Sequence, residues 1–364
     1  MTWPRSKSLR RISLLRGRMR ELSLDALLVS SPENVRYLTG FTGSNGLAIV
    51  TRTDAYFLTD SRYTLQSAQE VRACRRFITA RPLSEEAAAR KLLKGCASAG
   101  FEAHKLPYGQ ALALRKAFPR VHMRATAEIV ERLGLVKDSD EIASIRRAAA
   151  IADEVFRDVL PTIAPGVTEL EIAAEISWQN RKHGGERDAF DVIVASGVRG
   201  SLPHARPSTK KVKKGELVTL DFGSVVDGYC SDLTRTVGVG RIPRALRHAY
   251  EAVKEAQAEA IAAVQGGMKA SALDAVARAS LHRHRLGKYF IHSLGHGLGL
   301  RIHEHPRISA LSNEFLTVGS VITIEPGVYI PGLGGVRIED DVEICDGRCR
   351  LLTHAPRELL VRGA

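Results

Sequence analysis

The sequence predicts two domains that combine helices with strands: an α/β domain over residues 1–135 and a duplicated α+β domain over residues 136–364. Three observations lead to this fold class. Strand and helix signals alternate in the first part, whereas the order helix, helix, strand-rich segment occurs twice in the second. The 364 residues, of which 44% are hydrophobic, also suffice to build two cores.

The first 135 residues open with an amphipathic helix, because apolar residues recur at helical spacing from Leu9 to Leu22. The glycine-rich segment 39–46 lacks the spacing of a phosphate-binding loop, so we expect a turn there. The domain boundary is expected just after Gly134. Strands are expected at 26–30, 46–51, 55–59 and 76–80, and helices near 61–73 and 84–97.

The second domain begins with two helix-capping patterns. Asp138 with Glu141, and Thr168 with Glu171, match the capping box at the start of two successive helices. Strand-rich sequence follows, and then the same order recurs. This repetition predicts a pseudo-twofold axis and a central site built from both halves. The later elements are expected at 189–238 (strands), 244–264 and 271–286 (helices), and 289–353 (strands).

Composition limits the partners and the location. A formal net charge of +13 raises the question of nucleic acid, but only 5% of residues are aromatic and no nucleic-acid-binding motif is recognisable. The basic amino terminus lacks the apolar run of a secretory signal, and no stretch is long enough to span a membrane. Five scattered cysteines are typical of reduced thiols, although Cys345 and Cys349 could meet across a turn. We therefore expect a cytoplasmic protein with no nucleic-acid or membrane partner.

Five residues of the second domain have the chemistry of a two-metal hydrolytic site. Four carboxylates and one imidazole form a hard, oxygen-rich ligand set that can bridge two divalent cations roughly 3.5–4 Å apart. Four negative charges balance two dications, so a hydroxide can be held at neutral pH. The five residues are Asp221 in LDFG, Asp232 in SDLT, His296 in GHGLG, Glu325 in IEPG and Glu339 in RIED.

A hairpin turned by Asp227-Gly228 brings the two aspartates together. Its register places Asp221 opposite Thr234, so that Asp221 and Asp232 are diagonal neighbours on one face, roughly 7–8 Å apart at the backbone. A slip of one residue would send one aspartate to the other face. Asp227 itself lies in the turn, and we expect it to be structural.

The other acidic pair lies near a second turn, expected from Pro331 to Gly335. Alternation along the following strand places Arg337 and Glu339 on one face, which makes the arginine a candidate outer group beside a ligand. Glu325 is flanked by apolar residues that indicate burial, and a buried carboxylate requires a charge partner.

The histidines are harder to assign. His292 lies four residues before His296, but HSLGH lacks the glutamate of a zinc-binding HExxH helix, so that interpretation fails. His303 could be catalytic, whereas His305 has no clear role. His204 follows a proline in a polar loop and, taken alone, is typical of an ordinary loop residue.

Taken together, these motifs resemble the pita-bread metallopeptidases, and within them the proline-specific branch of Xaa-Pro aminopeptidases and Xaa-Pro dipeptidases (prolidases). The resemblance implies a creatinase-type amino-terminal domain followed by a pita-bread catalytic domain. It covers nearly the whole chain and is carried, in the family's order, by NVRYLTGFTGSNG, FLTDSRY, PHARP, LDFG, DGYCSDLTRT, HSLGHGLGLRIHE, TIEPGVYIPG and GGVRIED.

The resemblance also implies roles for single residues. Glu325 would be both a metal ligand and a proton shuttle, His303 or His292 would stabilise the oxyanion, and His204 would bond the substrate near the scissile bond. The cofactors would be two divalent metal ions, Mn²⁺ first, with Co²⁺, Fe²⁺ or Zn²⁺ as alternatives. The implied ligands are Asp221, Asp232, His296, Glu325 and Glu339, and the implied outer catalytic shell is His204, His292, His303 and Arg337.

An Xaa-Pro aminopeptidase, acting on peptides with proline in the second position, is the favoured function, and we expect a homodimer. The closest alternative is an Xaa-Pro dipeptidase, which must also bind the carboxylate of a two-residue substrate. A methionine aminopeptidase would share the five ligands but usually lacks an amino-terminal domain of this kind. A catalytically inactive binding module would suit the basic charge, but it has no need of five metal ligands.

Overall fold

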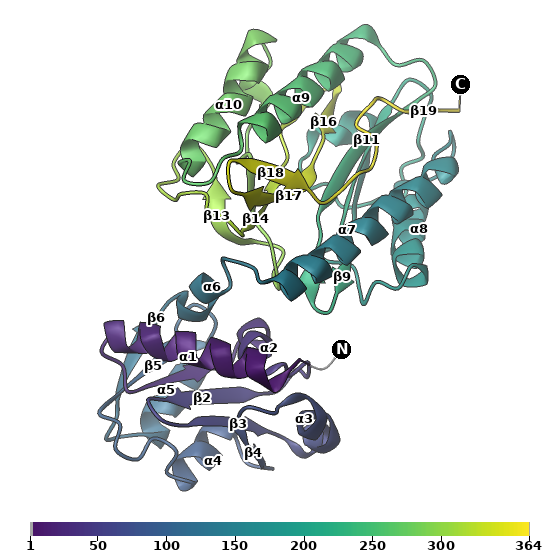
Figure 1. Cartoon of the computed structure of the whole chain (residues 1–364). Coiled ribbons are helices and arrows are strands. Elements are labelled where there is room, and N and C mark those ends of the chain that lie inside the picture. Colours follow the sequence, from purple (N-terminus) through teal and green to yellow (C-terminus); the bar gives the residue numbers. More distant parts are fainter. Residues whose placement is uncertain (1–2, 364) are drawn as a thin grey trace. The chain divides into compact units, whose positions relative to one another are not determined.

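The computed structural model describes residues 3–363, and the chain divides into two compact units, Met1–Gly134 and Leu135–Ala364 (Figure 1). The amino-terminal unit is built on a six-stranded sheet in the order β4-β3-β2-β1-β5-β6. β2 is antiparallel to both neighbours, and the other neighbouring pairs are parallel. The strands are β1 (Ala26–Val29), β2 (Leu47–Thr51), β3 (Ala55–Thr59), β4 (Arg75–Ile78), β5 (Ser98–Glu102) and β6 (His122–Thr126).

Helices cover this sheet. The amino-terminal helix buries Ile12, Leu15 and Met19 as its spacing predicts, but Leu9 of the same pattern is exposed. α4 is shorter than the predicted helix, because Lys91 adopts a left-handed backbone conformation (φ 56°) that ends it. The helices are α1 (Arg5–Glu21), α2 (Pro32–Thr39), η1 (Ser61–Tyr63), α3 (Thr64–Glu70), α4 (Leu83–Ala89), α5 (Tyr108–Ala117) and α6 (Ile129–Leu133).

The second unit contains the predicted repetition. α7 (Ser139–Val159) and α8 (Glu169–Lys182) both begin with the predicted capping boxes, and they pack together. α9 (Arg244–Ala263) and α10 (Ala270–Arg283) form the corresponding pair in the second half (Figure 1). The short helices of this unit are η2 (Leu160–Thr162), η3 (Gly197–Ser201) and η4 (Gly287–Tyr289).

Each helix pair is accompanied by its own sheet. The first half has the sheet β19-β11-β8-β7 and the ribbon β9–β10, and the second half has β13-β12-β14-β17-β18 and the ribbon β15–β16. The strands are β7 (Ile193–Ser196), β8 (Leu217–Phe222), β9 (Val225–Val226), β10 (Tyr229–Cys230), β11 (Leu233–Val239), β12 (Gly295–Gly297), β13 (Glu304–Ile308), β14 (Val321–Ile324), β15 (Gly327–Ile330), β16 (Gly334–Arg337), β17 (Asp340–Cys345), β18 (Arg348–Leu351) and β19 (Val361–Arg362).

The hairpin that carries the two aspartates has the predicted register. Asp221 pairs with Thr234 across β8 and β11, and the turn residues Asp227 (φ 49°) and Gly228 (φ 80°) both have positive φ, as a type I′ turn requires. Asp227 is structural, since its carboxylate accepts hydrogen bonds from Ser144 (3.2 Å) and Arg147 of α7.

One local prediction was wrong, and one possibility that the sequence left open is excluded. The second turn is shorter than expected, because Ile330 already pairs with Gly334, and only three residues connect the strands. Cys345 pairs with Arg348, and Cys349 pairs with Ile344, so the two thiols lie on opposite faces of the β17–β18 hairpin and cannot meet across it. Among the described residues, no helix combines the length and the hydropathy that a membrane span requires.

Candidate metal centre

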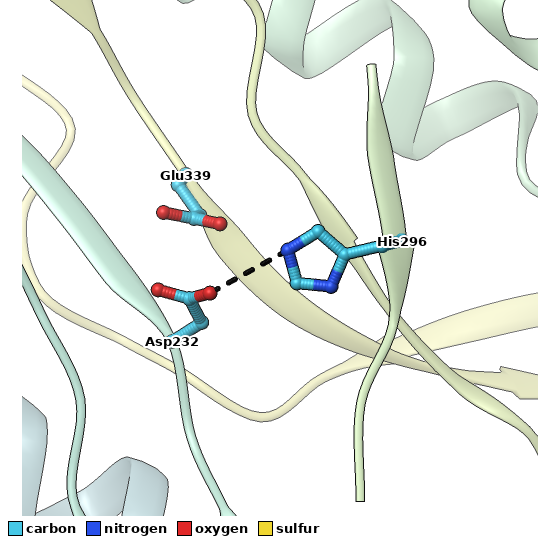
Figure 2. Close-up of side chains that lie close together, drawn as sticks. All are labelled: Asp232, His296 and Glu339. Carbon is cyan, nitrogen blue, oxygen red and sulfur yellow. Dashed lines mark ion pairs between the residues drawn. The ribbon is translucent and has the colours of Figure 1, made fainter. Parts of the chain in front are cut away.

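Three of the five predicted ligands form a compact cluster in the second unit. Asp232, His296 and Glu339 each offer one ligand atom, and these atoms all lie within 4.8 Å of one another (Figure 2). Asp232 directly precedes β11, His296 is the central residue of β12, and Glu339 lies between β16 and β17. The cluster therefore takes one residue from the first half of the unit and two from the second.

Glu325 joins this cluster from the end of β14. Its Oε1 lies 3.4 Å from His296 Nε2, and Asp232 Oδ2 lies 3.7 Å from the same nitrogen. Thr323 holds both groups, because its hydroxyl accepts the backbone N–H of His296 (3.1 Å) and donates to Glu325 Oε1 (3.2 Å). The side chains of four predicted ligands thus meet around one ring nitrogen.

Asp221, in β8, is connected to the cluster through Arg337. The guanidinium donates from Nη2 to Asp221 Oδ2 and from Nε to the hydroxyl of Thr234 (3.1 Å). That hydroxyl in turn donates to Glu339 Oε2 (2.6 Å). The structure therefore brings all five predicted ligands to one site. Arg337, expected on one face with Glu339, bonds Asp221 directly and is linked to Glu339 through Thr234.

The imidazole of His296 is oriented as a metal ligand. Its Nδ1 lies 3.0 Å from the carbonyl oxygen of Gly297, so Nδ1 carries the proton and Nε2 presents its lone pair to the carboxylates. Burial, assisted by the neighbouring His303, lowers the pKa of His296 to about 4, which keeps the ring neutral at physiological pH.

The buried carboxylates of the cluster have too few positively charged partners. Burial raises the pKa of Glu325 to about 8 against the opposing effect of Arg337, and burial together with neighbouring carboxylates raises the pKa values of Asp232 and Glu339. Within residues 3–363, the Oδ1 atoms of Asp221 and Asp232 are buried without a hydrogen-bond partner. Buried charges of one sign with unpaired oxygens cost free energy unless cations compensate them. The residues present therefore fit divalent cations.

A chain of hydrogen bonds extends outward from Asp221. His292 donates from Nδ1 to the carbonyl of Ser293 (2.7 Å), so its Nε2 accepts from the hydroxyl of Tyr329 (2.9 Å). The Tyr329 oxygen accepts from Arg337 Nη1 (2.6 Å). Burial lowers the pKa of His292 to about 4. His292 and Arg337 thus both belong to the same connected group.

The other two predicted histidines lie at the exposed side of the site. The His303 ring packs edge-on against His296, with ring centroids 4.4 Å apart. His204 is exposed, and its charge contributes to the lowered pKa values of both His292 and His303, which places it near them. Its loop is anchored by Pro203, whose carbonyl accepts from Arg337 (3.2 Å). His305 instead bonds Glu314 (2.8 Å).

Sequence reasoning missed four residues that shape the site: Thr234, Thr323, Tyr329 and Asp341. Asp341 is fully buried and accepts the backbone N–H of Asp232 (2.9 Å). The run of three acidic residues that begins at Glu339 was the signal for it, because such a run inside apolar strands indicates buried, paired charges. The predicted hairpin register already placed Thr234 beside Asp221.

Two family models match the chain. Metallopeptidase family M24 matches residues 143–346, and the Creatinase/Prolidase N-terminal domain matches residues 11–136. The chain belongs to metallopeptidase family M24. It is thus a metal-dependent hydrolase, and its predicted architecture, a creatinase-type domain followed by a pita-bread domain, is confirmed.

Relatives with two different activities in their names are similar over almost the full length. The Xaa-Pro dipeptidase of Pyrococcus furiosus is 37% identical, covering 94% of this chain and 97% of that protein. The structure of an Xaa-Pro dipeptidase from Bacillus anthracis has 37% identity and a TM-score of 0.95, covering 97% of this chain and 99% of that one. The structure of an X-Pro aminopeptidase from Thermotoga maritima MSB8 has 34% identity and a TM-score of 0.88, covering 94% and 99%.

Proposed function

We propose that this protein hydrolyses the peptide bond between an amino-terminal residue and a proline in the second position. The observation that carries the proposal is the convergence of Asp232, His296, Glu325 and Glu339 around the bare Nε2 of His296. In family M24 such a set is suited to peptide hydrolysis. The proline preference is supported by the names of the similar proteins, which are Xaa-Pro peptidases of both kinds.

We assign the metal ligands as Asp221, Asp232, His296, Glu325 and Glu339. Divalent ions held there would lower the pKa of a water molecule and polarise the substrate carbonyl. Glu325 would accept a proton from that water at its carboxylate and return it to the leaving group.

His303 is a better candidate than His292 for a hydrogen bond to the developing oxyanion. A neutral His292 has its proton on Nδ1, where Ser293 accepts it, and its Nε2 already accepts from Tyr329. It therefore has no N–H to offer a substrate. His303, by contrast, is exposed and packs beside His296. His204, in the same exposed region, would bond the substrate near the scissile bond.

Two substrate classes remain in competition. The sequence favours an aminopeptidase that acts on longer peptides. A dipeptidase is supported at least as well, because the dipeptidase structure from Bacillus anthracis has the higher identity and TM-score of the two solved relatives described above. An inactive binding module is less well supported, since it would have no need to bring Asp232, His296 and Glu339 within reach of one ion.

The deciding experiment compares Xaa-Pro dipeptides with Xaa-Pro-Yaa tripeptides, using protein that has been treated with a chelator and then reloaded with Mn²⁺. Preferred cleavage of tripeptides supports the aminopeptidase, and preferred cleavage of dipeptides supports the dipeptidase. Equal rates on peptides that lack proline would contradict both. The choice of Mn²⁺ over Co²⁺, Fe²⁺ or Zn²⁺, the homodimer and the cytoplasmic location stay predictions from the sequence.

A further inference from the structure

A fully buried ion pair lies directly behind the candidate metal centre. Arg235 belongs to β11, in the first half of the catalytic unit, and Asp340 begins β17, in the second half. Their side chains are 1% and 0% exposed, and Arg235 Nη2 lies 2.7 Å from Asp340 Oδ1. The pair therefore crosses between the two repeats at the level of the ligands Asp232 and Glu339.

Arg235 uses all of its donor capacity on this junction. Its guanidinium donates to the carbonyl oxygens of Thr234 (2.9 Å) and Glu339, and to the carboxylate of Asp340. It also donates to the carbonyls of Ala355 (2.7 Å) and Pro356 (2.9 Å). Five hydrogen bonds match the five N–H groups of a guanidinium, and they bind the backbone on both sides of the junction in one plane.

Asp340 is equally saturated. Its Oδ1 accepts from Arg235 and from the hydroxyl of Thr353 (2.7 Å), and its Oδ2 accepts from Gln257 (2.5 Å) and Arg357 (2.6 Å). Two guanidinium groups thus meet one carboxylate directly behind an acidic ligand cluster.

The hydrogen bonds next to the pair act directly on ligand residues. Glu339 donates its backbone N–H to the Thr234 carbonyl (3.1 Å), and Asp232 donates its backbone N–H to Asp341 (2.9 Å). Arg235 directly follows Thr234, and Asp340 lies between Glu339 and Asp341 in the sequence. A small shift at the pair would consequently move the backbone of a ligand from each half.

Stability alone does not explain a pair of this kind. Replacing a buried ion pair by well-packed apolar residues is often neutral or even stabilising, because the desolvation of two charges offsets their attraction. What an apolar pair cannot do is orient backbone carbonyls. Metal ligands must be held to within about 0.5 Å, and loss of a supporting residue typically costs about 10–100-fold in metal affinity.

We propose that Arg235 and Asp340 are positioning residues that align the ligands of the two halves, Asp232 and Glu339, for metal binding. This inference rests on the proposed metal-dependent function. It concerns neither a ligand nor a group that touches the substrate.

The test measures metal binding by titration with Co²⁺, whose visible absorption spectrum reports the ligand geometry, together with the melting temperature. Arg235→Lys keeps the charge but loses the planar array of donors, and we expect Co²⁺ to bind about 10-fold or more weakly with an altered spectrum. Asp340→Asn keeps the shape but removes the negative charge that both guanidinium groups bind, and we expect weaker Co²⁺ binding as well.

Glu169→Gln is the matched control. Glu169 is also fully buried and paired with an arginine (Arg199, 2.9 Å), and it bonds Ser196 and Ser208, away from the ligands. It should lower the melting temperature without changing Co²⁺ affinity or the spectrum. If Arg235→Lys and Asp340→Asn lower only the melting temperature and leave Co²⁺ binding unchanged, as the control does, the pair only stabilises the fold and the proposal fails.

Arg357→Gln keeps the test decisive if the stronger variants do not fold. Arg357 is partly exposed, and its substitution removes only one of the donors to Asp340. Co²⁺ affinity should therefore fall as in the stronger variants, but by a smaller factor. Unchanged affinity in this folded variant would overturn the proposal. Failure of the wild-type protein to bind Co²⁺ at all would instead refute the proposed function, which separates the two conclusions.

Discussion

The two halves of the catalytic unit build their shares of the metal centre in different ways. The first half places Asp221 and Asp232 in or beside a regular antiparallel pair, β8 and β11, whose register follows from a two-residue turn. The second half places His296 in a three-residue strand with a register shift, and Glu325 and Glu339 just beyond strand ends. The repeated topology thus supplies the predicted metal ligands from regular strand pairing in one half and from irregular strand pairing in the other.

Both halves have a glycine at a close approach of two backbone segments next to a predicted ligand. A Cβ on Gly223 would lie 1.9 Å from the carbonyl oxygen of Ser231, and a Cβ on Gly297 would lie 2.0 Å from that of His305. Both contacts are impossible for any other residue without backbone movement. In each half, a glycine next to a ligand therefore allows a neighbouring segment to approach closely. The halves differ in the regularity of their strand pairing, not in the distance between the paired backbones.

The largest effect is expected from the irregular half. Glu325→Gln keeps the side-chain shape but removes a ligand charge and the proposed proton acceptor. We expect turnover to fall by about 10³-fold or more, since loss of a general base alone costs about 10²–10⁴-fold, and bound metal to fall as well. Metal analysis and steady-state kinetics check this. Glu314→Gln, which alters a carboxylate bonded to His305, should retain both properties.

The next effect separates ligands from outer residues. His303→Ala should lower turnover by roughly 10²-fold, the scale of losing one oxyanion stabiliser, while bound metal stays near two ions per chain. His305→Ala serves as the neighbouring control, because His305 bonds Glu314, and its kinetics should match the wild type. Loss of metal in His303→Ala as severe as in Glu325→Gln would show that our division of roles is wrong.

A third pair of variants compares the halves directly. Gly223→Ala and Gly297→Ala each force a close approach apart, and we expect each to lower the free energy of unfolding by about 1–3 kcal/mol or more. Denaturant unfolding measures this. Gly109→Ala, in α5 with open space around the new Cβ, should not destabilise. A larger loss for Gly297→Ala would mean that the irregular half has less freedom to relax.

The smallest effect is a pH dependence of the metal-free protein. The pKa of Glu325 rises from 4.5 to about 8 on folding, so its neutral form is favoured in the native state. Its contribution to stability is present below about pH 4.5 and is lost as the pH rises through about 8. The melting temperature of chelated protein should therefore fall as the pH rises from about 4.5 to about 8. Saturating Mn²⁺ should raise the melting temperature and flatten this slope. Equal slopes with and without metal would refute the assignment.

Much of the fold was predictable from short-range patterns. The capping boxes of α7 and α8, four strands of the amino-terminal sheet and the hairpin register were all read from neighbouring residues. β5 and β6 were missed, because SAGFE and HMRAT combine glycine, alanine and charge without a clear alternation. Their strand conformation comes from parallel pairing with β1 and with each other, which no local pattern records.

The sequence by itself determined which ligand types are available to the metal centre, since the oxygen and nitrogen donors of four carboxylates and one histidine follow from residue identity alone. Only the tertiary structure decided which nitrogen of His296 is bare, that Arg337 bonds Asp221, and that His292 has no further N–H for a substrate. The bond from Thr234 to Glu339 spans 105 residues of sequence, and the Arg235–Asp340 pair also spans 105. Such contacts depend on how the sheets of the two halves pack against each other, which no pattern among neighbouring residues records.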